Sequence, residues 1–175
     1  MSMFTVLDTM LAAFQDDEIG LAVQVEKLNA ECDRDVRSDF GFCKWVVRQK
    51  LRDTRTPSVT IYPFTGADEV AAKQIGHADN VQEVVAAVEY FEADPEKRQD
   101  AIALIQAAMV AVLVELVDFA NAQAEAAAAA GSPVTSKIYD LVSPVITTYG
   151  EFESPPSALG AGYSSRITLR ERSRK

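Results

Sequence analysis

One long helix with a sharply marked start constrains the fold of this chain more than any other feature. Asp94 stands where an N-cap belongs, Pro95 stands at the first helical position, and Glu96 follows. A carboxylate at the cap accepts a free backbone N–H, and proline at the first position has no N–H to leave unsatisfied. The alanine-rich tract at 122–130 continues the pattern, because alanine is the best helix former, and Gly131 supplies a stop signal.

The apolar residues of this helix form two neighbouring stripes. One stripe recurs at spacings of three and four residues: Ile102, Ile105, Met109, Val112, Leu116 and Phe119. A second lies beside it: Val110, Leu113, Val114 and Val117. Together they cover about 220° of the circumference, whereas a helix on one sheet needs a stripe only somewhat above about 100° wide. We therefore expect a second cover, an N-terminal helix or a neighbouring subunit, with Val110, Val114 and Val117 at a subunit interface. A coiled coil is an alternative, although the stripe runs for only about three heptads.

The same helix is too short in its apolar part for a membrane span. The apolar stretch from Ala101 to Val114 has 14 residues, includes Gln106, and is followed by Glu115. A span needs about 20 residues, so we interpret this segment as a core helix and expect no membrane. We also expect no signal peptide, because the N-terminus lacks a basic leader and Asp8 interrupts its apolar run.

Charge is unevenly distributed along the chain. The net charge is −9, but five bases and one acid follow from Arg166 onward, so this end carries +4 and the first 165 residues carry −13. The acidic balance disfavours general binding to nucleic-acid phosphates, which calls for a basic face. We expect the basic end, with Arg166, Arg170 and Arg172, to dock on the acidic body of a neighbouring subunit. The alternative is a solvated, frayed terminus.

Helices and strands are predicted in the remaining segments. Helical spacing marks 3–15 and 18–32, although the second segment also alternates locally like a strand. Strands are predicted at 58–62, 80–92, 135–149 (with Pro144 at an edge or bulge) and 163–170. Residues 39–51 are compatible with either type, and their aromatic and β-branched content favours a strand. Residues 150–162, rich in Gly, Pro and Ser, are expected to form a long loop.

These elements predict one domain of the α+β class. The 175 residues are enough for a single core, and 48% apolar with 25% charged residues is typical of a soluble globular protein. We expect a mixed or antiparallel sheet of about four strands, packed by the long central helix and the N-terminal helices. The domain would divide into an N-terminal helical part at 1–56, the sheet and long helix at 57–170, and a basic tail at 171–175.

No catalytic signature is visible in the sequence. His77, the only histidine, lies in a polar stretch without a Gly-x-Ser-x-Gly motif, and we interpret it as a surface residue. Cys32 and Cys43 form no Cys-x-x-Cys pair, and a structural zinc site needs four ligands, so two reduced thiols are expected. The glycines fit no phosphate-binding spacing. We therefore expect no enzymatic activity, no cofactor and no metal.

Three adjacent carboxylates are a weaker candidate for a metal site. Asp16, Asp17 and Glu18 could offer oxygen ligands to a divalent cation. Acidic residues also suit the first turn of a helix, and this is the interpretation that we favour.

The order of elements resembles a known family of virion proteins. The chain carries PSVTIYP, then VQEVVAAVEYFEADPEKRQDAIALIQAAMV, a Gly- and Pro-rich loop, and YSSRITLRER. Over residues 18–170 this pattern resembles the tail terminator proteins of tailed bacteriophages, which form part of the neck between head and tail. In that family a β-branched strand runs into an acid-started helix in a similar way, and a late strand, here Ile167-x-Leu169, closes the sheet.

The resemblance implies an α/β fold that assembles as a six-membered ring in the virion. The ring would cap the tail tube, stop its growth and present a surface to the head-side connector. DNA would pass through an acidic lumen without specific binding. The protein would be made in the cytoplasm of the host bacterium and would have no active site. The alanine-rich tract at 122–130 and the basic tail do not match the family pattern.

Two other functions remain open at this stage. A different neck or tail ring component, such as a stopper or a tube-like protein, would be predominantly β. A cytosolic α+β dimer that binds a small ligand would have a concave apolar pocket.

Overall fold

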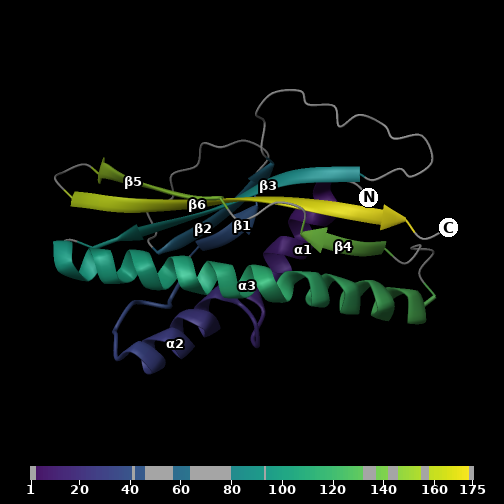
Figure 1. Cartoon of the computed structure of the whole chain (residues 1–175), viewed down its shortest axis with the longest axis horizontal. Coiled ribbons are helices and arrows are strands. Elements are labelled where there is room, and N and C mark those ends of the chain that lie inside the picture. The colour runs from purple at the N-terminus through teal and green to yellow at the C-terminus, as the bar shows by residue number, and fades with distance from the viewer. Residues whose placement is uncertain are drawn as a thin grey trace.

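The computed structural model describes residues 3–40, 42–45, 57–63, 80–92, 94–131, 137–141, 146–154 and 158–173. Within these ranges the elements follow in the order α1 (Met3–Gln15), α2 (Leu21–Cys32), β1 (Phe42–Trp45), β2 (Ser58–Pro63), β3 (Asn80–Phe91), α3 (Pro95–Ala129), β4 (Lys137–Leu141), β5 (Ile146–Ser154) and β6 (Ala158–Ser173). The predicted α+β class is confirmed, with helices and a mixed sheet packed together (Figure 1).

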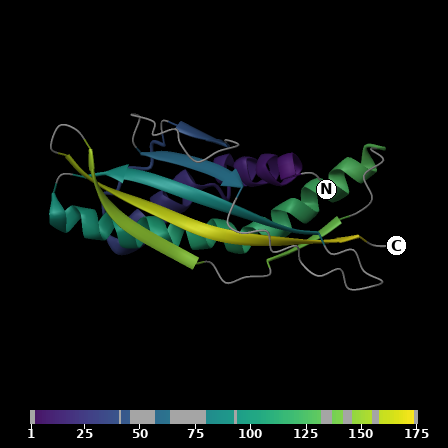
Figure 2. The same cartoon turned by 90° about the horizontal axis from the view of Figure 1, so that it is seen from above.

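The described strands form one sheet in the order β1-β2-β3-β6-β4, and β5 also pairs with β6. The β1–β2 pair is parallel and the other pairs are antiparallel. β6 has β3 along one edge and both β5 and β4 along the other (Figure 2). Leu141 of β4 pairs with Leu169, whereas Ile146 of β5 pairs with Arg166, so β4 lies beside the C-terminal part of β6 and β5 lies beside its N-terminal part.

The helices pack on one face of this sheet. α1 contacts β1, β2 and β3, whereas α3 contacts β6 and β4. α3 runs along the length of the sheet, and α2 packs on α3 at a greater distance from the strands (Figure 1). The order of layers is therefore sheet, then α1 and α3 side by side, then α2.

Alternation along β3 decides which residues enter the core. Val84, Ala86 and Val88 are fully buried and belong to one apolar cluster with residues of all three helices. Val85 and Tyr62 are also buried, at 5% and 8% exposed, but they lie outside that cluster, as expected for the opposite face. The strand predicted at 80–92 is confirmed, and the sheet is covered on both faces at β2 and β3.

The predicted start and stop of the long helix are confirmed. The Asp94 carboxylate accepts a hydrogen bond from the Glu96 N–H at 3.0 Å, with Pro95 as the first helical residue. At the other end Gly131 has φ of 77°, and its N–H donates to the Ala128 carbonyl at 3.1 Å. Glycine adopts this left-handed conformation without a Cβ penalty, so it ends the helix at little cost.

By length and composition α3 could also cross a membrane, and it is the one helix among the described residues that could. A core helix of a soluble protein passes the same test. Ile105, Met109 and Leu113 are fully buried against the other elements of the chain. We therefore interpret α3 as the core helix that the sequence predicts.

The two N-terminal helices are confirmed, so the strand alternative for residues 18–32 is wrong. For residues 39–51, the strand interpretation is confirmed at Phe42–Trp45, and residues 46–51 lie outside the described part. β1 lies within the N-terminal part at 1–56 and joins the same sheet as the later strands.

The predicted loop at 150–162 is wrong. Most of this segment belongs to the β5–β6 hairpin, in which Gly150 pairs with Gly162 and Phe152 pairs with Gly160. Glycine is unfavourable in isolated strands, but a long antiparallel ladder on both sides of β6 overrides this local preference. The sheet has six described strands rather than about four, because β1 joins it and two strands, β4 and β5, stand where one was predicted at 135–149. β6 also extends to Ser173, so Glu171 and Arg172 of the basic tail are part of the sheet.

Candidate interface on helix α3 and strand β6

Helix α3 leaves two large apolar side chains open to solvent. Val110 is 43% exposed and Val114 is 67% exposed, although Met109 and Leu113, which directly precede them in the sequence, are fully buried. Val117, one turn further, is half-buried. Leu113, which the sequence places in the same stripe, belongs to the core. The rest of the chain therefore covers one side of α3 and leaves the valine side largely open.

The open side is a continuous surface along the helix. Its members recur every three or four residues, so they lie one above another: Ala103, Ala107, Val110, Val114 and Val117. We call these five residues the α3 flank. All are exposed except the half-buried Val117.

The charged residues that α3 itself places beside its flank are acidic. Glu115 and Asp118 are exposed beside it. Between Gln99 and Ala129, α3 carries four acids and no base. The flank is thus an apolar strip with a negative border.

Part of the second cover that the sequence predicts comes from the N-terminal helices. Leu21 and Val25 of α2 are fully buried in the cluster that includes α3. An exposed ion pair between Arg34 and Asp100, at 3.0 Å, joins the end of α2 to the first turns of α3. These contacts leave Val110 and Val114 uncovered, so α2 supplies only part of the expected cover.

The basic residues of β6 occupy positions on one face of the strand. Arg166 pairs with Val85, Arg170 pairs with Asp140, and Arg172 pairs with Ile138 of β4. Residues opposite each other in an antiparallel pair share a face, so these positions lie on the face of Val85. This face is opposite to the one on which α3 packs. The structure therefore does not bring the predicted valines and arginines of one chain together.

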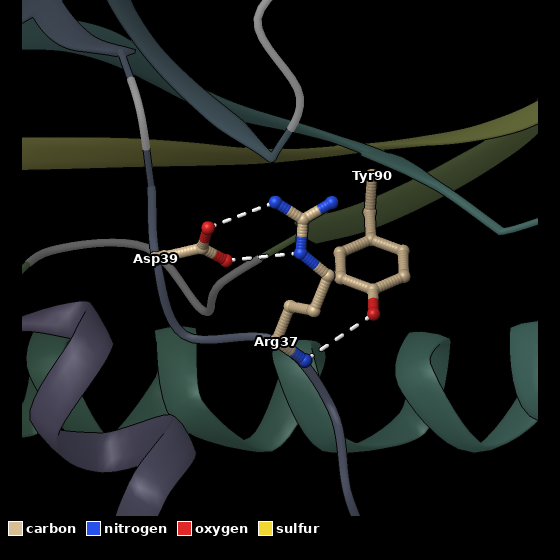
Figure 3. A network of polar contacts seen from close by, with 3 residues as sticks. All are labelled: Arg37, Asp39 and Tyr90. Atoms are coloured by element: carbon tan, nitrogen blue, oxygen red, sulfur yellow. Dashed lines mark hydrogen bonds and ion pairs between the residues drawn. The ribbon is translucent and has the colours of Figure 1, made fainter.

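A polar network fixes the segment that follows α2. The Arg37 guanidinium donates to Asp39 at two positions, with Nε to Oδ1 at 3.0 Å and Nη2 to Oδ2 at 2.8 Å. The Arg37 backbone N–H donates to the Tyr90 hydroxyl at 3.3 Å. Figure 3 shows the Tyr90 ring beside the Arg37 side chain. The network ties the segment after α2 to the end of β3.

The electrostatic effects in this network follow from those contacts. The hydrogen bond from Arg37 lowers the pKa of the Asp39 carboxyl, and the same bond raises the pKa of Arg37. Burial raises the pKa of the Tyr90 hydroxyl. The Arg37 and Asp39 side chains are both exposed, so they form a surface ion pair with a structural role. Sequence reasoning did not find it, because Arg37 and Tyr90 are far apart in the chain and carry no shared local pattern.

The predicted helix-start role of the three adjacent acids is wrong in detail. α2 begins at Leu21 with Gly20 as its cap, and no acid lies in its first turn. The Asp16 carboxylate instead closes the preceding turn, accepting from the N–H groups of Glu18 at 2.9 Å and Ile19 at 3.1 Å. In the described part of the chain, no three His, Cys, Asp or Glu side chains gather closely enough to hold a metal.

The two cysteines have different surroundings. Both are free thiols; Cys32 is exposed, whereas Cys43 is half-buried. Burial raises the pKa of the Cys43 thiol to about 11, so this thiol is protonated at neutral pH. His77 lies outside the described residues.

Comparison with models of protein families gives no match, and no curated protein matches the chain.

Proposed function

We propose that this chain is a structural virion protein, the tail terminator of a tailed bacteriophage. In this proposal its copies form a six-membered ring that caps the tail tube and joins it to the head-side connector. The observation that carries the proposal is the exposure of Val110 and Val114 on an otherwise well-buried core helix. Burying apolar surface is worth about 25 cal/mol per Å², so this flank favours contact with a further subunit.

The arrangement of elements agrees with the family that the sequence resembles. β3 runs through the Asp94 cap into the long helix α3, and β6 completes the sheet beside β3. These features match the β-branched strand, the acid-started helix and the late closing strand of tail terminators. A ring component needs shape and contact surfaces rather than a reactive centre, so the proposal assigns no catalytic role to any residue.

The charge of the chain suits a ring through which DNA passes. The net charge of −9 makes each subunit acidic. Like charges repel, so an acidic lumen would let DNA through without holding it. The proposal therefore includes no specific binding of DNA and no membrane.

The proposal is tested by the oligomeric state of the purified chain and of one variant. We expect light scattering after size exclusion to give a hexamer, or a monomer that forms rings when tail tubes are added, and negative-stain images to show the rings. Val114→Glu places a charge at a 67% exposed position, so the chain should fold but should not assemble. Ala30→Glu, at an exposed position of α2, is the matched control and should assemble normally.

A third variant separates interface from core. Leu113 is adjacent to Val114 in sequence but fully buried, so Leu113→Glu should prevent folding altogether. The proposal would be overturned by a stable dimer whose melting temperature rises with a small ligand. Assembly of Val114→Glu into normal rings would also count against it.

A further inference from the structure

We infer that neighbouring copies meet through two different surfaces: the α3 flank of one copy docks on the basic end of β6 of the next. On the first surface, Glu115 and Asp118 border the valines. On the second, Arg170 and Arg172 provide the positive charge. The inference rests on the proposed ring and adds which surfaces form its contact.

The charge of α3 argues against contact between two α3 flanks. From Gln99 to Ala129 the helix carries Asp100, Glu115, Asp118 and Glu125, with no base. A two-fold contact through the flanks would bring acids of one copy toward acids of the other. Like charges across an interface are destabilising, so the partner surface should be basic.

The end of β6 has the complementary charge. The alternate positions of one face from residue 166 onward are Arg166, Thr168, Arg170 and Arg172. Glu171, the acid of this segment, falls on the other face because neighbouring residues of a strand alternate. One face of this strand end therefore carries three bases and no acid of its own.

The positions of the three arginines indicate that the contact lies at the C-terminal end of β6. Arg166 lies opposite Val85, which is buried, so the sheet is covered there. Arg172 lies one residue beyond Glu171, where the pairing with β3 stops, and its partner on β4 is the uncharged Ile138. Arg170 lies opposite an acidic residue, Asp140 of β4, in the register of the sheet. Arg172 is therefore the best single position for a test.

The placement of the two surfaces makes the contact intermolecular. α3 packs on the face of the sheet that holds Val84, whereas the arginine positions lie on the face that holds Val85. One chain cannot bring its own flank to its own basic end across the sheet. A contact between different surfaces leaves one of each free at every step, and only closure into a ring satisfies all of them.

Charge reversal tests the inference in the full-length chain. Glu115→Arg and Arg172→Glu should each raise the dissociation constant of the ring by about tenfold or more. The double variant should restore assembly, because the arginine at position 115 of one copy then meets the glutamate at position 172 of the next. An equal mixture of the two single variants should also assemble, with the variants alternating around a ring that has an even number of subunits. Glu31→Arg, an exposed reversal on α2, is the control and should leave assembly unchanged.

Each outcome decides between the two proposals. Circular dichroism and thermal melting establish that the variants are folded, and Arg172→Gln provides a milder variant if Arg172→Glu is not. If the wild-type chain forms rings but neither the double variant nor the mixture recovers them, the inference fails and the proposed function stands. Residues 44–55 are also rich in Lys and Arg. If Lys44→Glu abolishes rings while Arg172→Glu does not, the partner surface lies elsewhere and the inference also fails. If the wild-type chain forms no ring even with tail tubes, the proposed function itself fails.

Discussion

The indole Nε1 of Trp45 donates a hydrogen bond to the Asp8 carboxylate, with 2.7 Å between Nε1 and Oδ1. The bond joins β1 to α1, and Trp45 is half-buried against the hydrophobic core. β1 is only four residues long and pairs with β2 alone among the described strands. A short edge strand has little ladder of its own, so this side-chain bond helps to hold it on the domain.

Removal of the Asp8 carboxylate should weaken the attachment of β1. We expect Asp8→Ala to lower the free energy of unfolding by about 1 kcal/mol, because the indole N–H loses its charged acceptor. Asp8→Asn keeps a carbonyl oxygen and should lose less. Trp45 is the only tryptophan, so its fluorescence during urea unfolding reports this site directly. An unchanged unfolding midpoint in Asp8→Ala would contradict the prediction.

Loss of the Tyr90 hydroxyl should loosen the segment after α2. Tyr90→Phe leaves the Arg37 N–H without the acceptor that it has at 3.3 Å, and we expect a loss of about 1 kcal/mol. Thermal unfolding followed by circular dichroism measures the change. Tyr62→Phe removes a hydroxyl from the opposite face of the sheet and serves as the comparison. Faster hydrogen exchange near residue 37 should accompany the loss in Tyr90→Phe alone.

A methyl group at Gly20 should not be tolerated. A Cβ there would clash with the Asp16 carbonyl oxygen and would lie 2.9 Å from the Asp16 nitrogen, both backbone atoms. The turn would have to open, so Gly20→Ala should cost about 1–3 kcal/mol in urea unfolding.

Gly131→Ala provides the contrasting case. Its Cβ would meet nothing within 4 Å, but the residue has φ of 77°. The cost there is left-handed strain at the end of α3, about 1 kcal/mol, and Gly131→Asn should cost less because asparagine tolerates this conformation. A larger loss in Gly131→Ala than in Gly20→Ala would show that the close contact at Gly20 is easily relieved.

The two thiols should differ strongly in reactivity. At neutral pH an alkylating reagent should modify the exposed Cys32 first, because the pKa of Cys43 is raised from 9.0 to about 11 and its thiolate is correspondingly scarce. Mass spectrometry of the digested protein measures each rate. Rapid modification of Cys43 in the folded chain would contradict the structure.

The same raised pKa predicts a dependence of stability on alkaline pH. The folded state favours the neutral thiol of Cys43, so its contribution is complete below the unfolded pKa of 9.0 and is lost as pH rises through about 11. Cys43→Ala should therefore lose less stability than the wild-type chain over that range. Urea midpoints of both proteins at a series of pH values measure the difference.

Local signals in the sequence predict the elements that depend on near neighbours. The Asp94 cap and the Pro95 start of α3 lie within two residues of each other, and their geometry follows from backbone chemistry alone. The alternation of Val84 and Val85 likewise reports the two faces of β3. The exposed positions Val110 and Val114 belong to a stripe that helical spacing reveals, although the burial of Leu113 beside them depends on where the other elements pack.

Features that depend on distant partners could not be predicted from the sequence. Gly160 and Gly162 weaken a strand locally, and only pairing with β3 and β5 makes their segment extended. The bond between Trp45 and Asp8 joins residues 37 positions apart, and the contact of Arg37 with Tyr90 spans 53. Spacing patterns carry no information about such pairs, because the fold alone brings them together.

The place of β6 in the sheet has a consequence for biogenesis. Every strand that it joins is synthesised earlier, and among the described strands it alone links the β1-β2-β3 part to β4 and β5. During translation β1, β2 and β3 can pair with one another before β6 is made, whereas β4 and β5 have no partner among the described strands until β6 emerges from the ribosome, so the two parts of the sheet join only then.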